Sequence, residues 1–357
     1  MKIRLLRIAL LAGSTLASFA LLEFTVRALF PFYNPQGPHQ IVFHVNEAGV
    51  PLGPENQTIR QRSPQGDYDL KVSFNRLGFR DRQDLTSATS TDWFAVGDSF
   101  GLGWGVEETN RFSNLLENMA EVRVFNICVP ADIAGYIQLV GYAQAQGRVG
   151  ISNLVVSICM ENDLRDYYRP NPTAEPPSKH TTKEALRAFI KRHSAVYLLL
   201  ATELQQSEAS HRFFQAIGIA RKEESDELMH KNQFDEPAIR YSINLLNQLA
   251  SGRRRVLALI IPTRALWIGK NREVEAKVHD LFVSEVRKRG NIEVIDMRPV
   301  FEATGDPLQF HFKHDGHWNE KGHKLAAQYL AELILSDKQS RADDTRNGTA
   351  TQDNSIR

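Results

Sequence analysis

The feature that most restricts the fold is a series of five short apolar runs that alternate with longer amphipathic segments after residue 92. Most of the runs are rich in valine and isoleucine, as strands buried inside a parallel sheet are. They span Trp93–Val96, Val122–Cys128, Leu154–Cys159, Val256–Ile261 and Ile292–Ile295. The amphipathic segments predict helices over Glu108–Met119, Ile133–Gln146, Glu236–Leu249, Arg272–Lys288 and Glu320–Leu335. This alternation predicts an α/β fold built on a five-stranded, doubly wound parallel sheet.

The N-terminus has the composition of a membrane anchor. Three basic residues precede an uncharged run, Ile8–Leu22, which alone is shorter than the roughly 20 residues that cross a bilayer. Glu23 and Arg27 can pair on one helical face, which allows the helix to continue. We therefore expect residues 1–33 to be a single-pass signal anchor in the inner (cytoplasmic) membrane, with an extracytoplasmic, periplasmic body. The alternative is a secreted protein, cleaved near Ser18–Ala20.

The remaining chain divides by composition. Residues 34–91 are rich in proline, glycine and polar residues and predict an irregular or β-containing lead-in to the domain at 92–335. A helical insertion at about 164–234 separates the third and fourth strands, and both a lid and a peripheral cap are open readings. The polar tail 336–357 is expected to be disordered.

The net charge and the number of cysteines exclude several classes of function. The formal net charge of +1 gives no basic surplus, so no nucleic-acid partner is expected. Cys128 and Cys159 are too few for a disulfide framework, and since each ends an apolar run we expect both to be buried.

Polar side chains follow the first three predicted strands. Ser99 follows the first strand, Asn126 lies at the end of the second, and Asn162–Asp163 follow the third. Asp315 and His317 come much later, in a loop before the last predicted helix. Ligands of open parallel sheets bind at the carboxyl ends of the strands, so these groups are the candidates for a site.

These residue types suit acyl transfer. A serine hydroxyl becomes nucleophilic when an imidazole takes its proton, and the imidazole needs a carboxylate to fix its tautomer. Donors must also face the developing oxyanion. The candidates are the Ser99 backbone N–H, a backbone N–H in the loop after Asn126, and the Asn162 amide.

Four blocks in this order resemble those of the SGNH (GDSL-type) hydrolases: "GDSF", "N", "ND" and "DGHW". The resemblance covers about Asp92–Leu335 and implies a flavodoxin-like αβα sandwich, in a family of esterases, lipases and carbohydrate O-deacetylases. The segment "FNRLGFRD", Phe74–Asp81, is similar to one found upstream of the serine in membrane-anchored members.

The resemblance also implies roles. Ser99 would be the nucleophile, His317 the base and Asp315 its orienting partner. The oxyanion hole would comprise the Ser99 and Ala131 backbone N–H groups and the Asn162 amide. Supporting residues would be Asp98, Asn126 and Asp163. The expected activity is a serine esterase that forms an acyl-serine on small O-acyl (acetyl) esters of saccharides or envelope components, without a cofactor.

Several alternatives stay open. An O-acyltransferase would use the same triad. The loop "NICVPAD" lacks the glycines that usually follow the asparagine, and Met160 stands where a glycine usually begins the third block. These differences also allow a non-catalytic saccharide-binding protein. Gly97–Gly101 fits a nucleophile elbow of α/β-hydrolases, but no strand–helix alternation precedes it. A metal site was considered and is not expected; its ligands would come from Asp315 and the histidines His311, His314, His317 and His323.

Overall fold

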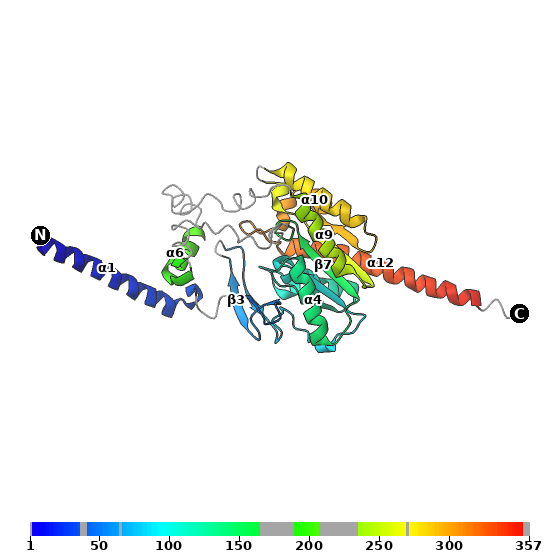
Figure 1. The fold of residues 1–357 in the computed structure, drawn as a ribbon, viewed down its shortest axis with the longest axis horizontal. Coiled ribbons are helices and arrows are strands. Elements are labelled where there is room, and N and C mark those ends of the chain that lie inside the picture. Colours follow the sequence, from blue (N-terminus) through cyan, green and yellow to red (C-terminus); the bar gives the residue numbers. More distant parts are fainter. Residues whose placement is uncertain are drawn as a thin grey trace. The chain divides into compact units, whose positions relative to one another are not determined.

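The computed structural model describes residues 2–35, 41–63, 66–164, 189–190, 192–206, 235–268 and 271–352. The chain divides into two compact units (Figure 1). The first, called the anchor unit here, comprises Met1–Ile41, Ile59–Lys71 and Arg169–Lys222. The second, the α/β unit, comprises Val42–Thr58, Val72–Tyr168 and Glu223–Arg357. The predicted lead-in 34–91 is thus shared between the two units.

The α/β unit is built on a five-stranded sheet in the order β6-β5-β7-β8-β9, with every neighbouring pair parallel. The predicted α/β class and five-stranded parallel sheet are therefore confirmed. Strand β6 is shorter than predicted at both ends, although the Ile127 and Val129 N–H groups still donate to the Ala95 and Gly97 carbonyls of β5. The strands are β5 (Trp93–Gly97), β6 (Val124–Asn126), β7 (Asn153–Cys159), β8 (Arg255–Ile261) and β9 (Glu293–Asp296).

Helices connect the strands and cover the sheet (Figure 1). One apolar core joins α4, α9 and α10 to alternate residues of the strands, such as Phe94 and Val96. Both cysteines are free and buried, as predicted. The helices of this unit include α2 (Ser99–Leu102), α3 (Phe112–Ala120), α4 (Ile133–Gly147), α9 (Glu236–Ala250), α10 (Arg272–Arg287), α11 (Met297–Glu302) and α12 (Glu320–Gln352).

The lead-in contains two small two-stranded sheets. The first pairs β1 (His44–Val45) with β2 (Pro51–Leu52), and the second pairs β3 (Thr58–Arg62) with β4 (Asp69–Ser73). The predicted β content of this region is therefore present. The turn after β4 leads directly to the segment "FNRLGFRD".

The last helix continues beyond its predicted end. Helix α12 extends to Gln352, so the expectation of a disordered tail from residue 336 is wrong at least that far. Two side chains hold the first turn past Leu335: Asp337 pairs with Arg255 at 3.1 Å, and the Lys338 ammonium donates to the Ala120 carbonyl at 2.9 Å. Beyond these contacts the sequence contains alanine, arginine and glutamine, which favour a helix even without an apolar face.

The anchor unit contains the N-terminal apolar helix. Helix α1 (Lys2–Leu29) includes one stretch, Leu10–Leu29, long and apolar enough to cross a membrane, as a signal sequence also is. The predicted pair is present, with the Arg27 guanidinium 2.8 Å from the Glu23 carboxylate. An N-terminal membrane segment is therefore consistent with both the sequence and the structure.

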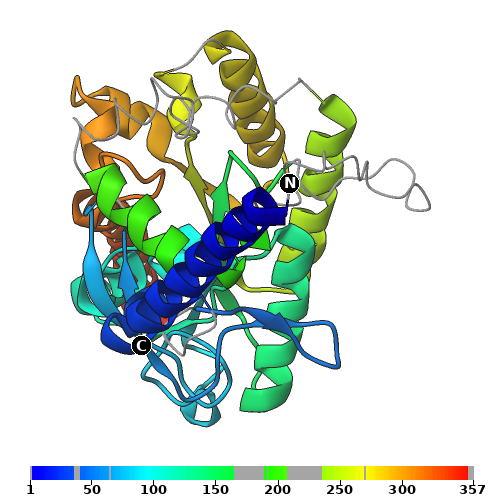
Figure 2. The same ribbon diagram turned by 90° about the vertical axis from the view of Figure 1, so that its left-hand side faces the viewer.

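Glu23 also joins α1 to a second helix, α6 (Ala195–Gln206), which lies beside it in Figure 2. Its carboxylate accepts from the backbone N–H groups of Ala195 and Val196, at 2.7 and 3.1 Å, and from the Ser194 hydroxyl at 2.9 Å. Glu23 therefore caps the start of α6. Of the predicted insertion at 164–234, residues 165–188, 191 and 207–234 lie outside the described residues, and its role as lid or cap is not addressed.

The Glu23 cap predicts that Glu23→Gln loosens α6. An amide nitrogen would replace one carboxylate oxygen and face N–H donors, which costs about 1–3 kcal/mol when the donors are buried. Hydrogen exchange of the peptide covering residues 192–206, measured on the full chain in detergent, is expected to become about tenfold faster. Glu55→Gln, at an exposed turn, is the matched control and should leave that peptide unchanged. Unaltered exchange in Glu23→Gln would contradict the capping role.

Helices α3 and α12 meet at a buried histidine. The Phe112 N–H, at the start of α3, donates to His323 Nδ1 at 3.3 Å, so His323 satisfies one of the helix's unpaired N–H groups. Burial, followed by the positive charges of Arg111 and Arg80, lowers the pKa of His323 to about 3. The imidazole is therefore neutral in the folded protein.

This neutral histidine predicts a loss of stability in acid. The unfolded chain binds a proton below about pH 6.5, whereas folded His323 does not until about pH 3. The stabilisation that neutral His323 provides is complete above the pKa of the histidine in the unfolded chain. As the pH falls below that value, the free energy of unfolding decreases by up to about 1.4 kcal/mol per pH unit. His323→Gln keeps an acceptor for Phe112. The free energy of unfolding, measured with urea, should fall between pH 7.5 and pH 4.5 in both proteins. The fall should be roughly 2–3 kcal/mol smaller in this variant than in the parent. The exposed His314→Gln should retain the parental loss.

Candidate active site

The candidate site begins at the carboxyl end of β5. Asp98 follows the strand and caps α2, since its carboxylate accepts from the Phe100 N–H at 2.9 Å. Ser99 is the first residue of this four-residue helix. The two flanking glycines are required by close packing, because a Cβ at Gly97 would lie 1.7 Å from Ser157 Oγ and one at Gly101 2.5 Å from Cys128 Sγ. The "GDSFG" turn therefore holds Ser99 where larger neighbours would not fit.

Ser99, His317 and Asp315 form a hydrogen-bonded chain. Ser99 Oγ lies 2.8 Å from His317 Nε2, although 218 residues separate them in sequence. His317 Nδ1 lies 2.5 Å from Asp315 Oδ1, and the same oxygen accepts from the His317 backbone N–H at 2.9 Å. The His317 and Asp315 side chains are 23% and 20% exposed, so the chain is shielded yet reachable. The structure thus brings together the three residues that the sequence singled out first.

The loop that carries Asp315 and His317 is held by Arg264 and by hydrogen bonds within the loop itself. Arg264, in the loop after β8, donates from Nη1 to the Asp315 carbonyl at 3.3 Å. His311 and Trp318 pair across the loop, and the Phe312 N–H donates to the His317 carbonyl at 3.0 Å. Trp318 is fully buried. It packs at the entry to α12, against Phe301 and His323.

Two aromatic side chains contact the His317 imidazole. Both come from residues 98–106, the segment after β5 that is called the serine loop here. The Phe100 ring centroid lies 4.8 Å from that of His317, and the Trp104 centroid lies 5.7 Å away with the planes 27° apart. The Trp104 backbone N–H also donates to the Ser99 carbonyl at 3.0 Å. The loop that presents the hydroxyl therefore also positions the ring of its hydrogen-bond partner.

The remaining predicted donors occupy different places. The Asn162 side chain is close enough to Asp98, the residue before Ser99, to favour the ionised form of that carboxyl and so lower its pKa. Ala131 immediately precedes Asp132, the N-cap of α4, and packs at the edge of the apolar core. Among the described residues, Ala131 is not one of those with a positive φ, so its methyl group causes no backbone strain.

The carboxyls around the serine loop are strongly buried. Burial raises the pKa of Asp98. The charge of His317 and the N–H groups that donate to the Asp98 carboxylate act in the opposite direction and lower that pKa. Burial also raises the pKa of Asp163, and the negative charge of Asp98 adds to that rise. Asp163 accepts from the Tyr136 hydroxyl at 2.7 Å and from the Cys159 N–H at 2.8 Å, which closes the turn after β7.

Asn126 supports the serine loop rather than facing the hydroxyl. Its amide donates to the Gly101 carbonyl and to Ser113 Oγ, both at 2.9 Å, while its carbonyl oxygen accepts from the Cys128 N–H at 3.1 Å. Its side chain is therefore committed to the backbone around α2.

The histidines of the alternative metal site do not come together in the structure. His311 packs against Trp267 and Phe301, and its burial, with the charge of Arg264, lowers the pKa of its imidazole to about 3. His323 lies instead between α3 and α12. Within the part of the chain that the structure describes, there is no group of three His, Cys, Asp or Glu residues that could hold a metal ion.

Three residues at the site were missed by sequence reasoning. Phe100 directly follows Ser99 and Trp104 comes five residues after it, but only the structure shows that both rings contact His317. Arg264 follows β8 at the carboxyl edge of the sheet, and the rule that selected the other polar groups would have found it.

Comparisons with known proteins agree on one family. The family model described as "SGNH hydrolase-like domain, acetyltransferase AlgX" matches residues 223–355, which include Asp315 and His317 but not Ser99. No curated protein matches the sequence.

Three solved structures are similar to this chain at low identity. A lipase/acylhydrolase from Enterococcus faecalis is 11% identical, with a TM-score of 0.42 and coverage of 69% of this chain and 97% of that one. A G-D-S-L family lipolytic protein from Veillonella parvula is 15% identical, with a TM-score of 0.34 and coverage of 69% and 98%. The C-terminal catalytic domain of the Streptococcus pneumoniae peptidoglycan O-acetyltransferase A is 11% identical, with a TM-score of 0.35 and coverage of 70% and 97%. The match of residues 223–355 to an SGNH hydrolase-like family model agrees with the resemblance that the sequence blocks predicted.

Proposed function

We propose that the protein is a serine esterase or O-acyltransferase that acts through an acyl-Ser99 intermediate. The observation that carries this proposal is the hydrogen-bonded chain from Ser99 Oγ through His317 to Asp315. The 2.8 Å between Ser99 Oγ and His317 Nε2 is within the range needed for proton transfer from the hydroxyl to the imidazole. The matched family, described as an SGNH hydrolase-like acetyltransferase domain, supports the same reaction class.

In this mechanism, Ser99 Oγ attacks the carbonyl carbon of the ester while His317 Nε2 accepts the hydroxyl proton. Asp315 accepts a hydrogen bond from Nδ1, which keeps Nε2 free as the base and stabilises the imidazolium. The tetrahedral intermediate collapses to acyl-Ser99 as His317 returns the proton to the leaving alcohol. Water then releases the acyl group as an acid, or a second hydroxyl takes it as a new ester.

The oxyanion of the intermediate needs donors on the opposite side from His317. The Ser99 N–H is at the first turn of α2, where helix geometry provides no internal acceptor. The Ala131 N–H and the Asn162 amide are the other proposed donors, each worth about 3 kcal/mol when well placed. Asn162 lowers the pKa of Asp98, the residue that precedes Ser99, which supports its choice as a donor near the hydroxyl.

For the substrate, we propose small O-acyl groups, acetyl first, on saccharides or other envelope components. The structural neighbours include a carbohydrate esterase and a peptidoglycan O-acetyltransferase, which motivates the choice. We further propose that α1 is an uncleaved inner-membrane anchor with the α/β unit on the extracytoplasmic side. The basic residues before the apolar stretch support this orientation.

The proposal predicts that a fluorophosphonate probe labels Ser99. Ser99→Ala should abolish labelling and lower kcat on p-nitrophenyl acetate at least about a thousandfold, because the variant lacks the hydroxyl that lies 2.8 Å from His317 Nε2. Ser284→Ala, at an exposed serine on α10, is the control and should label normally. Failure of the parent protein to label would falsify the esterase mechanism. Free acetate measured with and without an oligosaccharide acceptor distinguishes hydrolysis from transfer.

Asp315→Asn is expected to lower kcat about 10³–10⁴-fold with the protein still folded. The amide can keep the backbone bond to the His317 N–H, but it would turn an N–H toward Nδ1 or favour the wrong tautomer. Asp306→Asn, in the exposed loop before residue 307, is the matched control and should retain activity. Steady-state kinetics at pH 7.5 decide the matter, and parental kcat in Asp315→Asn would remove Asp315 from the mechanism.

A further inference from the structure

The segment "FNRLGFRD" ends beneath the serine loop, and its two last residues have no role in the mechanism above. The turn that presents them is tight: Asn75 Oδ1 accepts from the Leu77 and Phe79 N–H groups at 2.9 and 3.1 Å. Gly78 has a φ of +78°, and a Cβ there would lie 2.7 Å from the Gly53 carbonyl oxygen. The turn therefore fixes where the next residue, Arg80, enters the core.

Arg80 is 1% exposed, and its guanidinium donates to three backbone carbonyls of the serine loop. Nη1 reaches the Leu102 and Gly103 carbonyls at 3.2 and 2.5 Å, and Nη2 reaches the Val106 carbonyl at 2.7 Å. These carbonyls lie at the end of α2 and on both sides of Trp104. One guanidinium thus binds the last carbonyl of the helix that begins with Ser99 and two carbonyls of the chain that follows it.

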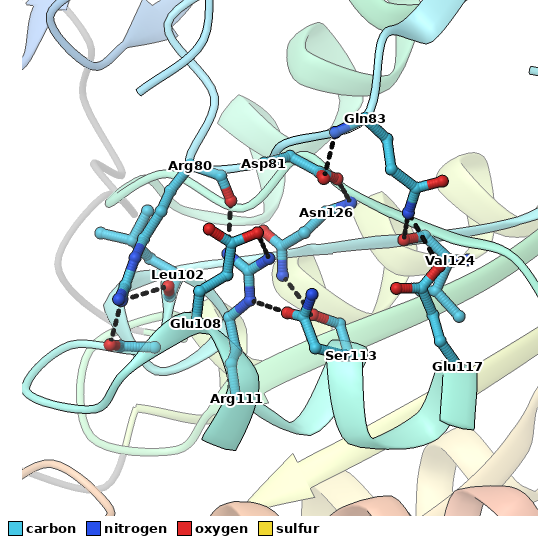
Figure 3. Close-up of polar contacts among 12 residues, drawn as sticks. Arg80, Asp81, Gln83, Leu102, Glu108, Arg111, Ser113, Glu117, Val124 and Asn126 are labelled. Atoms are coloured by element: carbon cyan, nitrogen blue, oxygen red, sulfur yellow. Dashed lines mark hydrogen bonds and ion pairs between the residues drawn. The ribbon is translucent and has the colours of Figure 1, made fainter. Parts of the chain in front are cut away.

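Other side chains hold Arg80 in place, as Figure 3 shows. Arg111 donates from Nη1 to the Arg80 carbonyl, and its own charge lies 3.9 Å from Glu108. The Arg111 side chain packs under the loop so closely that a Cβ at Gly103 would lie 2.9 Å from it.

Asp81 extends the same network to the neighbouring strand. Its carboxylate accepts from the Asn126 N–H at 2.5 Å and from the Gln83 N–H at 2.9 Å. Asn126 in turn donates to the Gly101 carbonyl. Through Arg80 and Asn126, successive carbonyls of the serine loop at Gly101, Leu102 and Gly103 are all bound by buried side chains.

We propose that Arg80 is a positioning residue for the Ser99–His317 pair, which it controls through the loop that carries Trp104. The proposal rests on the proposed function. The loop sets the Ser99 carbonyl bond to the Trp104 N–H and the stacking of Trp104 on the His317 imidazole. Losing the guanidinium frees the three carbonyls it binds and allows the indole to leave the imidazole.

The test compares Arg80→Met and Arg80→Lys with Arg76→Met, all as full chains in detergent. Methionine removes the charge and the donors, whereas lysine keeps the charge on a single nitrogen that cannot reproduce the planar fork. Arg76 is the matched control, because it belongs to the same segment but is exposed and pairs with Asp84 at 3.1 Å. Titration with a fluorophosphonate counts the reactive sites, and kcat per titrated site and KM are then measured on p-nitrophenyl acetate.

Arg80→Met is expected to lower kcat per titrated site about ten- to hundredfold, as displacement of a reacting group by about 1 Å does. KM should change less than about threefold, Arg80→Lys should recover part of the loss, and Arg76→Met should match the parent. A fall in the number of sites with an unchanged rate per site would overturn the proposal, because Arg80 would then serve stability alone. Failure of both Arg80 variants to fold would overturn it for the same reason.

A second measurement needs no substrate. An imidazolium quenches the emission of a stacked indole, so the parent should lose tryptophan emission as His317 is protonated, and Trp104→Phe should lack this change. Arg80→Met should lack it too, whereas its persistence with parental amplitude would overturn the proposal. If the parent fails to react with the probe, the esterase function fails, yet this titration still decides whether Arg80 places Trp104 on His317.

Discussion

The chemistry proposed for this protein depends on the hydrogen bond between Ser99 and His317. This bond joins the end of β5 to a loop 218 residues later, so the whole sheet must assemble before the two side chains meet. Parallel pairing makes this possible, because β5, β7 and β8 all end at the same edge. Each element that ends there contributes one part: Ser99 after β5, Asn162 after β7 and Arg264 after β8. Local strain is low at these positions, since the described non-glycine residues with positive φ lie elsewhere.

The short helix α2 creates a structural difficulty that its neighbours resolve. A four-residue helix places the Ser99 hydroxyl at its first turn, but it leaves most of its own carbonyls without internal donors. Asp98 caps the start, while Asn126 and Arg80 bind the carbonyls at the end. Each of these caps comes from a different element. The serine is therefore held rigidly although the helix that carries it is too short to be stable alone.

The sequence predicted the sheet well because buried parallel strands have an unmistakable composition, and all five predicted runs became strands. It also selected Ser99, Asp315 and His317, which the structure brings within hydrogen-bond distance. The end of α12 was predicted wrongly, because the contacts of Asp337 and Lys338 are tertiary and leave no periodic signal. The same limit applies to Trp104 and Arg80: a stacked ring and a buried guanidinium are set by the path of distant loops. A local motif can therefore identify the reactive group, while its supporting contacts require three-dimensional information.

The energetics of the Arg80–Arg111 network explain why it bears on function more than on stability. Removing guanidinium groups from water costs several kcal/mol per ion even after relaxation, so apolar residues of similar volume would often give an equally stable core. Arg80 and Arg111 are nevertheless almost completely buried. What apolar residues cannot do is hold three carbonyls in fixed directions, which Arg80 does. Because the loop carrying those carbonyls also carries Trp104, the free energy spent on burying the charge fixes the ring next to the base. Buried charge is thus used here to specify one loop conformation, and the lead-in segment that supplies it is a structural part of the site.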